Sequence, residues 1–454
     1  METGVWISLA AYFLLMLAIG VYAWKKSTSN SEEYMLGGRD LSPSVAALSA
    51  GASDMSGWLL LGLPGALFVS GLSQSWIGIG LVIGAWLNWL IVAPRLRQQT
   101  EEYDNSLTIP GFLGNRFPSQ AVLLRIVSAV VIVVFFSVYT ASGLVGGGKL
   151  FASAFGGDYM TGVVITLGVV LVYTVMGGFL AVSLTDFVQG CIMMLALVIM
   201  PIVILTTQGG AGVDQAAARL TAIDPDYLSM FKGVTLLGWI SAMAWGLGYF
   251  GQPHIIVRFM AVRSVKDVPT ARRIGMSWMI VSLIGAIAVG IFGRAYAERT
   301  GLQVTDPETI FIMLSDLLFH PLVTGFLYAA LLAAIMSTVS SQLLVASSSL
   351  TEDIYLTVFK RNATERELVN VGRLAVLAVG AVAVLLASNP NSEILGLVAN
   401  AWAGFGAAFG PLIILALTWK RMTGAGAVAG LVTGALVVIL WIALGLSSTI
   451  YEIV

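Results

Sequence analysis

The stretch Gly51-Ala52-Ser53-Asp54-Met55-Ser56-Gly57 decides how this chain folds. It interrupts residues 43–71, an otherwise apolar run that exceeds the roughly 20 residues a helix needs to cross a bilayer. Small residues at this depth would also suit a close helix–helix contact. That interpretation does not explain Asp54, because even the mildest insertion scale assigns about 2.5–3.5 kcal/mol to an aspartate at a helix centre. We therefore predict that the helix breaks here and that Asp54 has a functional role.

A second interruption lies within residues 233–257, in the run Trp245-Gly246-Leu247-Gly248-Tyr249-Phe250-Gly251-Gln252-Pro253-His254. Its glycines and proline weaken a helix. One interrupted helix in each half of a membrane protein is typical of a transporter whose site lies at mid-membrane. An unwound helix frees carbonyls, which suit a hard cation, and N–H groups, which suit a carboxylate. The pair of breaks therefore predicts a site for a cation and an amino acid.

A third feature lies in residues 317–348, where Ala334, Ser337 and Thr338 share one helix face. One carbonyl and two hydroxyls there would form part of an oxygen cage for a cation. Alternatively, the hydroxyls bond back to the preceding turn, as they often do in membrane helices. In the second break, Trp245 and Tyr249 are i,i+4 neighbours. Their side chains could flank a small ring of a bound solute, or they could serve ordinary packing.

The composition predicts a protein embedded in lipid. Of its 454 residues, 58% are hydrophobic and 10% are charged, whereas a soluble domain carries about 25% charged residues. Twelve stretches are apolar and long enough to cross a bilayer, so we predict an all-α polytopic membrane protein with one domain, residues 1–454. Its parts are an extra N-terminal helix (4–24), a first five-helix repeat (43–206), a second five-helix repeat (233–419) and an additional C-terminal helix (423–446). Because five is odd, the two repeats enter the membrane with opposite orientations.

The positive charges predict the orientation. If the N-terminus lies outside, the cytoplasmic loops and adjoining helix ends hold all 23 lysines and arginines except Lys149, Arg219, Lys232, Arg294 and Arg299. This is the positive-inside bias, so we expect an N-terminus on the outer (periplasmic) side of a cell (inner) membrane. Residues 307–318 are expected to form a short helix over the outer face, where a lid would lie.

Several function classes find no support in the residues. There is no basic stripe for nucleic acid and no Gly-x-x-x-x-Gly-Lys loop for ATP. The two histidines and one cysteine, Cys191, are too few for a metal cage or an intramolecular disulfide. We predict no enzyme activity and no organic cofactor.

Five runs together resemble the sodium/solute symporter family, and within it the bacterial branch that carries proline. They are Tyr-Met-Leu-Gly-Gly-Arg at 34–39 and residues 48–58, 177–189, 246–254 and 399–411. The likeness extends over essentially the whole chain in order. It implies the leucine-transporter fold, a five-plus-five inverted repeat with flanking helices, and Na⁺-coupled symport of L-proline into the cell by alternating access, with the protein functional as a monomer. The family usually has thirteen helices, and we expect this chain to stop before the thirteenth.

The resemblance also implies roles for individual residues. The Na⁺ ligands would be the carbonyls of Ala52, Met55 and Ala334 and the hydroxyls of Ser337 and Thr338, with Asp54 setting Na⁺ affinity or coupling. The residues that would bind proline are Ser56, Gly57, Trp58, Tyr139, Trp245, Gly246, Tyr249 and Pro253. Asp186 and Arg39 are candidates for gating or release, although Asp186 could be a partner of a helix dipole and Arg39 a plain loop charge.

Other hypotheses remain open at this point. The same fold could carry another small solute, such as a vitamin, a sugar or a different amino acid. It could also form the membrane domain of a sensor, or a Na⁺ channel. A proton could replace Na⁺, because Asp54 is able to titrate.

Overall fold

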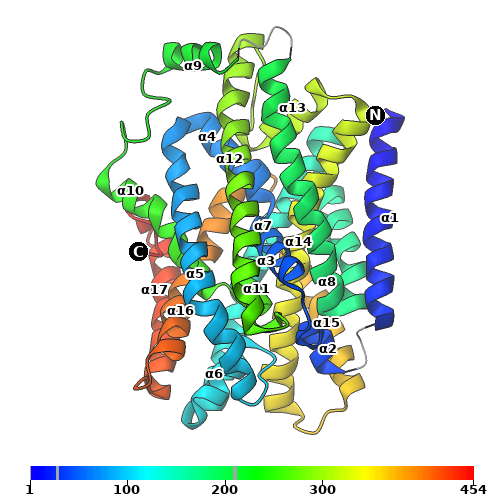
Figure 1. Cartoon of the computed structure of the whole chain (residues 1–454), viewed down its shortest axis with the longest axis vertical. Coiled ribbons are helices and arrows are strands. Elements are labelled where there is room, and N and C mark those ends of the chain that lie inside the picture. Colours follow the sequence, from blue (N-terminus) through cyan, green and yellow to red (C-terminus); the bar gives the residue numbers. More distant parts are fainter. Residues whose placement is uncertain (1, 27–29, 208–211) are drawn as a thin grey trace.

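The computed structural model describes residues 2–26, 30–207 and 212–454, and most of them are helical (Figure 1). The α-helices are α1 (Thr3–Lys26), α2 (Ser31–Leu36), α3 (Pro43–Asp54), α4 (Leu63–Ser70), α5 (Ser75–Glu102), α6 (Ile109–Arg116), α7 (Ala121–Phe155), α8 (Tyr159–Thr206), α9 (Gly212–Ile223), α10 (Leu236–Met243), α11 (Pro253–Ala261), α12 (Val268–Thr300), α13 (Ile310–Leu318), α14 (Pro321–Ser348), α15 (Glu365–Leu386), α16 (Ile394–Thr418) and α17 (Gly424–Ala443). The long helices run along one common axis, with α1 at one edge of the bundle and α17 at the other (Figure 1).

Within the described residues, nine helical stretches are long and apolar enough to cross a membrane. One of them, Trp58–Glu102, covers two predicted segments, because the chain turns back at Gly71–Gln74 between α4 and α5 (Figure 1). A further apolar helix, Tyr159–Val175, is shorter than a full span. The predicted segment 233–257 also falls short, because it is divided among α10, a 3₁₀ helix and α11. These three differences account for the twelve segments predicted from the sequence.

Two glycines make the sharp turns possible. Gly71 has φ 75°, and a Cβ on it would lie 2.3 Å from the carbonyl oxygen of Tyr227, which lies between α9 and α10. Gly178, at φ 56° and ψ −148°, kinks α8 and divides it into two spans. A Cβ at Gly178 would lie 2.7 Å from the backbone oxygen of Tyr34 in α2. Only glycine adopts these conformations without strain, so both turns are fixed by the sequence.

The predicted short helix over one face of the bundle is confirmed. Residues Pro307–Thr309 form a 3₁₀ turn that leads into α13. The Glu308 carboxylate accepts hydrogen bonds from the backbone N–H groups of Ile394 (3.1 Å) and Leu395 (3.1 Å), at the start of α16. It also pairs with Lys149 of α7 at 2.8 Å. Residues 307–318 are therefore fastened to two spans of the bundle.

The first interrupted helix lies at the centre of the bundle. α3 contacts α8, α11, α12 and α14, so elements of both predicted repeats meet around it (Figure 1). This arrangement brings the two interruptions seen in the sequence into one region.

Candidate functional site

The first predicted break is present, and it begins at Asp54. α3 ends there, and Met55 departs from helical geometry with φ −79° and ψ 73°. The chain resumes at Gly57 and continues as a π-helix, Trp58–Gly62, before α4. A Cβ on Gly57 would approach Ile335 Cγ1 of α14 to 3.2 Å, so the break lies close against that helix. The interruption leaves carbonyls at the end of α3 without intrahelical partners.

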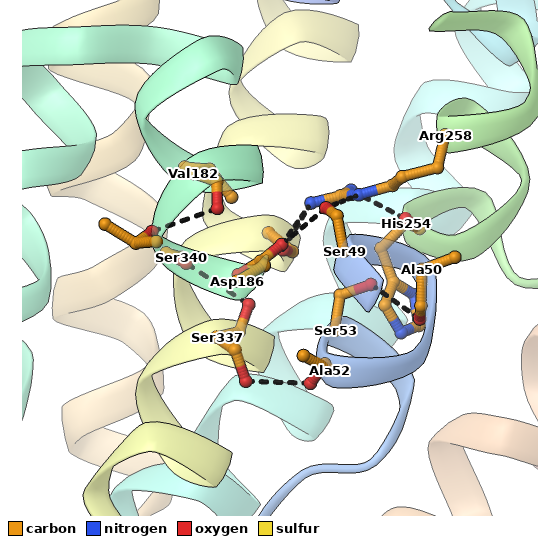
Figure 2. Close-up of polar contacts among 12 residues, drawn as sticks. Ser49, Ala50, Ala52, Ser53, Val182, Asp186, His254, Arg258, Ser337 and Ser340 are labelled. Carbon is orange, nitrogen blue, oxygen red and sulfur yellow. Dashed lines mark hydrogen bonds and ion pairs between the residues drawn. The ribbon is translucent and has the colours of Figure 1, made fainter. Parts of the chain in front are cut away.

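Four of the five oxygens predicted to bind Na⁺ converge at this break. The Ser337 hydroxyl donates to the Ala52 carbonyl at 2.7 Å and lies 3.2 Å from the Ala334 carbonyl. The Thr338 hydroxyl lies 3.3 Å from the Ala334 carbonyl and 3.5 Å from the Ala52 carbonyl. Figure 2 shows Ser337 pointing across from α14 to Ala52. The fifth predicted ligand, Met55, follows directly on α3, but its carbonyl takes no part in these contacts.

The chemistry of these groups suits a hard monovalent cation. Each is a neutral oxygen, and each hydroxyl can turn its hydrogen away and present a lone pair. Carbonyls of an unwound helix coordinate Na⁺ in transporters in this manner. The set therefore fits Na⁺ with rotation of two hydroxyl hydrogens.

The backbone and side chain of Asp54 organise the break. Its carbonyl accepts from the Ser56 N–H (2.9 Å), the Trp58 indole N–H (3.3 Å) and the Tyr139 hydroxyl (3.5 Å). One carboxylate oxygen, Oδ2, accepts a short hydrogen bond from the Tyr249 hydroxyl. The structure thus brings together at Asp54 four predicted site residues that come from three predicted segments: Ser56, Trp58, Tyr139 and Tyr249.

The second predicted break takes the form of a 3₁₀ helix, Ala244–Gly251, followed by extended Gln252. A 3₁₀ helix turns about 120° per residue, so residues four apart lie on different faces. Tyr249 accordingly reaches Asp54, while the Trp245 ring faces Trp58, with centroids 6.5 Å apart. Pro253 begins α11, where its missing N–H costs no hydrogen bond.

Close backbone contact holds the second break against α5. A Cβ on Gly246 would lie 2.2 Å from the Gly80 carbonyl oxygen, so no side chain fits at this position. The Trp402 indole of α16 donates to the Trp245 carbonyl at 2.7 Å. This 3₁₀ segment is therefore fixed on two sides.

Tyr451 is a residue of this region that the sequence analysis missed. Its ring stacks on Trp245, with centroids 5.3 Å apart and planes 26° from parallel. Its hydroxyl donates to the Ala399 carbonyl at 2.7 Å, and its backbone N–H donates to Ser241 at 3.0 Å. Both aromatic residues line a cavity of about 690 Å³. Tyr451 follows the last long helix, and no local pattern marks it as part of a site.

Asp186 lies in a different setting from the one predicted. It follows the Gly178 kink by about two turns of α8, whereas a partner of the helix dipole would lie in the first turn. Its carboxylate pairs with Arg258 of α11 at 3.2 Å, and both side chains are 0% exposed. It also accepts from the Ser49 hydroxyl at 2.7 Å (Figure 2) and from the Ser341 hydroxyl at 3.4 Å.

This cluster adds a second buried carboxylate and corrects one expectation. Like Asp54, Asp186 lies deep in an apolar stretch, Gly177–Thr206. Arg258 was counted among cytoplasmic loop charges, yet it is buried. Its position in the apolar run 253–261 was the available signal.

Arg39 is more than a loop charge. It lies outside the spans in a 3₁₀ turn, and it is 7% exposed. Its guanidinium donates to the carbonyls of Met260 (2.9 Å) and Ser106 (2.7 Å) and to the side chains of Thr100 (3.1 Å) and Asn105 (2.8 Å). Burial lowers the pKa of Arg39 to about 10, which leaves it charged at neutral pH. Arg39 thus ties its own turn to the end of α5, to the connection that follows α5 and to the end of α11.

Comparison with known proteins identifies the family. The model of the sodium:solute symporter family matches residues 34–434. The chain belongs to this family. The symporter is 60% identical over 439 residues to the high-affinity proline transporter PutP of Bacillus subtilis (strain 168), covering 97% of this chain and 92% of the relative. It is 56% identical over 456 residues to the osmoregulated proline transporter OpuE of the same strain, covering 100% and 92%. It is 55% identical over 441 residues to the sodium/proline symporter of Staphylococcus aureus (strain COL), covering 96% and 86%.

Solved structures show the same fold. A Na⁺-coupled sialic acid symporter in a substrate-bound outward-open state matches with a TM-score of 0.77 at 19% identity, over 97% of this chain and 98% of the other. Mhp1, a nucleobase-cation-symport-1 family transporter in a closed conformation, matches with a TM-score of 0.56 at 13% identity, over 94% and 96%. The predicted leucine-transporter fold is thereby confirmed. The symporter is a multi-pass membrane protein and a transporter rather than an enzyme.

Proposed function

We propose that this symporter carries L-proline into the cell together with Na⁺, by alternating access, as a monomer whose N-terminus lies outside. Three relatives that are 55–60% identical along nearly the whole chain are named as proline transporters, which supports the solute. Membership of the sodium:solute symporter family supports the coupling ion. The observation that carries the proposal is the convergence of four neutral oxygens, from Ala52, Ala334, Ser337 and Thr338, beside a broken helix.

Na⁺ binds between α3 and α14 in this proposal. The carbonyls of Ala52 and Ala334 and the hydroxyls of Ser337 and Thr338 coordinate it, with the Met55 carbonyl as a fifth ligand. Asp54 adds a negative charge to the same break and raises affinity for the cation without being one of the ligands. Because Ser337 already joins the two helices, the ion would strengthen an existing contact between them.

Proline binds on the other side of the break. Its carboxylate accepts from the Gly57 N–H and from the Ser56 hydroxyl, where the helix restarts. Its secondary ammonium and apolar ring lie among the aromatic side chains of Trp58, Tyr139, Trp245 and Tyr249. Gly246 and Pro253 shape the second break, which closes the other side of the site.

Coupling follows from the shared segment. Na⁺ that binds at Ala52 orders the chain through Asp54 to Gly57, and proline then finds the donors of Ser56 and Gly57 in place. A Na⁺ ion moving down a membrane potential of 100 mV gains about 2.3 kcal/mol, which corresponds to roughly 50-fold accumulation of solute. On the cytoplasmic side, the Asp186–Arg258 pair and the contacts of Arg39 hold the exit closed. Their separation would open the path for release.

Uptake of labelled proline into proteoliposomes tests the proposal. We expect accumulation with an inward Na⁺ gradient and none when choline replaces Na⁺ at equal ionic strength. A panel of unlabelled vitamins, sugars and amino acids should compete less well than proline. Accumulation driven equally by a proton gradient in the absence of Na⁺, or stronger competition by another solute, would refute the assignment.

A further inference from the structure

Behind Asp54, the structure contains a small cavity that is separate from the four-oxygen set. Its volume is about 20 Å³, which is enough for one water molecule. Its lining comes from α3, α5, the 3₁₀ helix, α11 and α12. None of the lining residues belongs to α14, which carries Ser337 and Thr338. The cavity and the four-oxygen set are therefore bounded by different helices around α3.

Two polar side chains in the wall of this cavity each have an oxygen without a partner among the described residues. They are Asp54, through Oδ1, and Asn88 of α5, through Oδ1. Asp54 is 3% exposed and Asn88 is 1% exposed, so bulk water does not reach either one. Leaving a buried acceptor without a donor costs about 1–3 kcal/mol, and more for a charged group. The Oδ2 atom of Asp54 already accepts a hydrogen bond from Tyr249, so only Oδ1 lacks a donor.

Three other side chains in the wall carry a donor: Tyr249, Trp89 and Trp278. The Tyr249 hydroxyl donates to the other oxygen of Asp54, and the indole N–H of Trp278 is bonded to the Gly190 carbonyl at 2.7 Å. The Trp89 indole nitrogen faces Gly275, since it would lie 3.6 Å from a Cβ there. Two unpartnered acceptors beside a cavity of this size match a molecule with two donor hydrogens, and such a molecule could also accept from Trp89.

We propose that this cavity is a binding site for structural water, which donates to the free oxygens of Asp54 and Asn88, and that Asn88 is a positioning residue for Asp54. The inference rests on the proposed Na⁺ coupling. Water there completes the hydrogen bonds of the Asp54 carboxyl group and holds it in place beside the break. Na⁺ affinity therefore depends on a side chain of α5 that does not touch the ion.

The test substitutes residues on two helices that line the cavity. It measures binding of radioactive sodium to the purified, full chain in nanodiscs without proline. Asn88→Leu removes the polar group and fills the space. Gly275→Ala fills the opposite wall, and its Cβ would meet Trp89 and Ala47 at ordinary distances of 3.6 and 3.7 Å. Gly78→Ala is the matched control. It also lies between α5 and α12, its Cβ would meet Ile287 and Leu283 at 3.8 Å, and it does not line the cavity.

We expect Asn88→Leu to raise the half-saturating Na⁺ concentration roughly tenfold, because a hydrogen bond to a charged group is lost. Gly275→Ala should raise it in the same direction, while Gly78→Ala should leave it unchanged. Asn88→Ser, which restores a hydroxyl and space for water, should recover most of the affinity. Proline affinity at saturating Na⁺ should change little in all four variants. A general structural defect would lower proline affinity as well.

Wild-type Na⁺ affinity in both Asn88→Leu and Gly275→Ala would overturn the inference. So would a fall in the number of Na⁺ ions bound per chain, since the cavity would then hold an ion instead of water. If wild-type protein binds no Na⁺, the proposed coupling itself fails, and that outcome is distinct from either of these.

Discussion

Removing the Thr338 hydroxyl alone is the sharpest test of the Na⁺ site. Thr338→Val keeps the shape of the side chain and deletes only the oxygen, whereas Thr338→Ser keeps the oxygen and deletes only a methyl group. In the structure, this hydroxyl lies 3.3 Å from one carbonyl and 3.5 Å from another. Both distances are longer than the roughly 2.5–3.0 Å that is usual for an O–H···O hydrogen bond. The hydroxyl therefore contributes little to the Na⁺-free protein.

The expected loss falls on Na⁺ binding. A neutral oxygen facing a charge contributes about 1.5–3 kcal/mol, by analogy with hydrogen bonds to charged groups, which corresponds to roughly 10- to 150-fold in affinity. The thermal unfolding temperature without Na⁺ should stay near that of the wild type. Because binding of the two ligands is linked, proline affinity at low Na⁺ should fall as well, and saturating Na⁺ should restore it.

Ser337 provides an internal comparison. Its hydroxyl makes a 2.7 Å hydrogen bond between α14 and α3, so Ser337→Ala should weaken Na⁺ binding and also lower the stability of the Na⁺-free protein. Na⁺ titrations of proline uptake and of bound radioactive sodium measure the first effect, and thermal unfolding measures the second. If Thr338→Val requires no more Na⁺ than Thr338→Ser, Thr338 is not a ligand and the proposed coordination is wrong.

Three further predictions concern the surroundings of the site. Asp54→Asn keeps the backbone carbonyl contacts of residue 54 but removes the negative charge. Half-maximal proline uptake should then need at least about tenfold more Na⁺. An unchanged Na⁺ dependence would exclude a role of Asp54 in coupling. Asp186→Asn leaves the guanidinium of Arg258 buried without its partner and should destabilise the protein by about 3–5 kcal/mol, while the double variant with Arg258→Gln should recover part of that loss in thermal unfolding. An equal or larger loss in the double variant would contradict a paired charge. The third prediction uses a cysteine introduced at Ser241 in a Cys191→Ser background. Tyr451→Ala should expose this cysteine to a membrane-impermeant thiol reagent, whereas Tyr451→Phe should not, because its ring still stacks on Trp245. Equal labelling with Tyr, Ala and Phe at position 451 would show that the Tyr451 ring does not cover Ser241.

The sequence predicted the interruptions well because each one breaks a strong local rule. A carboxylate in the apolar run 43–71 and the glycines and proline of 246–253 stand out against membrane helices, where every backbone group must be paired internally. The positions of the spans follow from the same rule. What the local pattern did not give was the form of the second break. Gly246 and Gly251 allow several conformations, and contact with Gly80 and α16 selects a 3₁₀ helix.

The partners of the site residues were decided only by the tertiary structure. Hydropathy assigned Arg258 to a loop, because a hydropathy scale gives every arginine the same value whether or not it has a buried partner. The Asp186 carboxylate, 72 residues earlier, allows that charge to be buried. Likewise, no local pattern marks Asn88 or Tyr451 as a site residue. Asn88 gains its role from a cavity that residues of α3 and α5 both line, and Tyr451 gains its role by stacking on Trp245. The breaks and the oxygens that they free can be read from the sequence, because in lipid every backbone group of a helix must be paired locally. Which groups meet those oxygens is a long-range property, because it depends on how distant segments pack around α3.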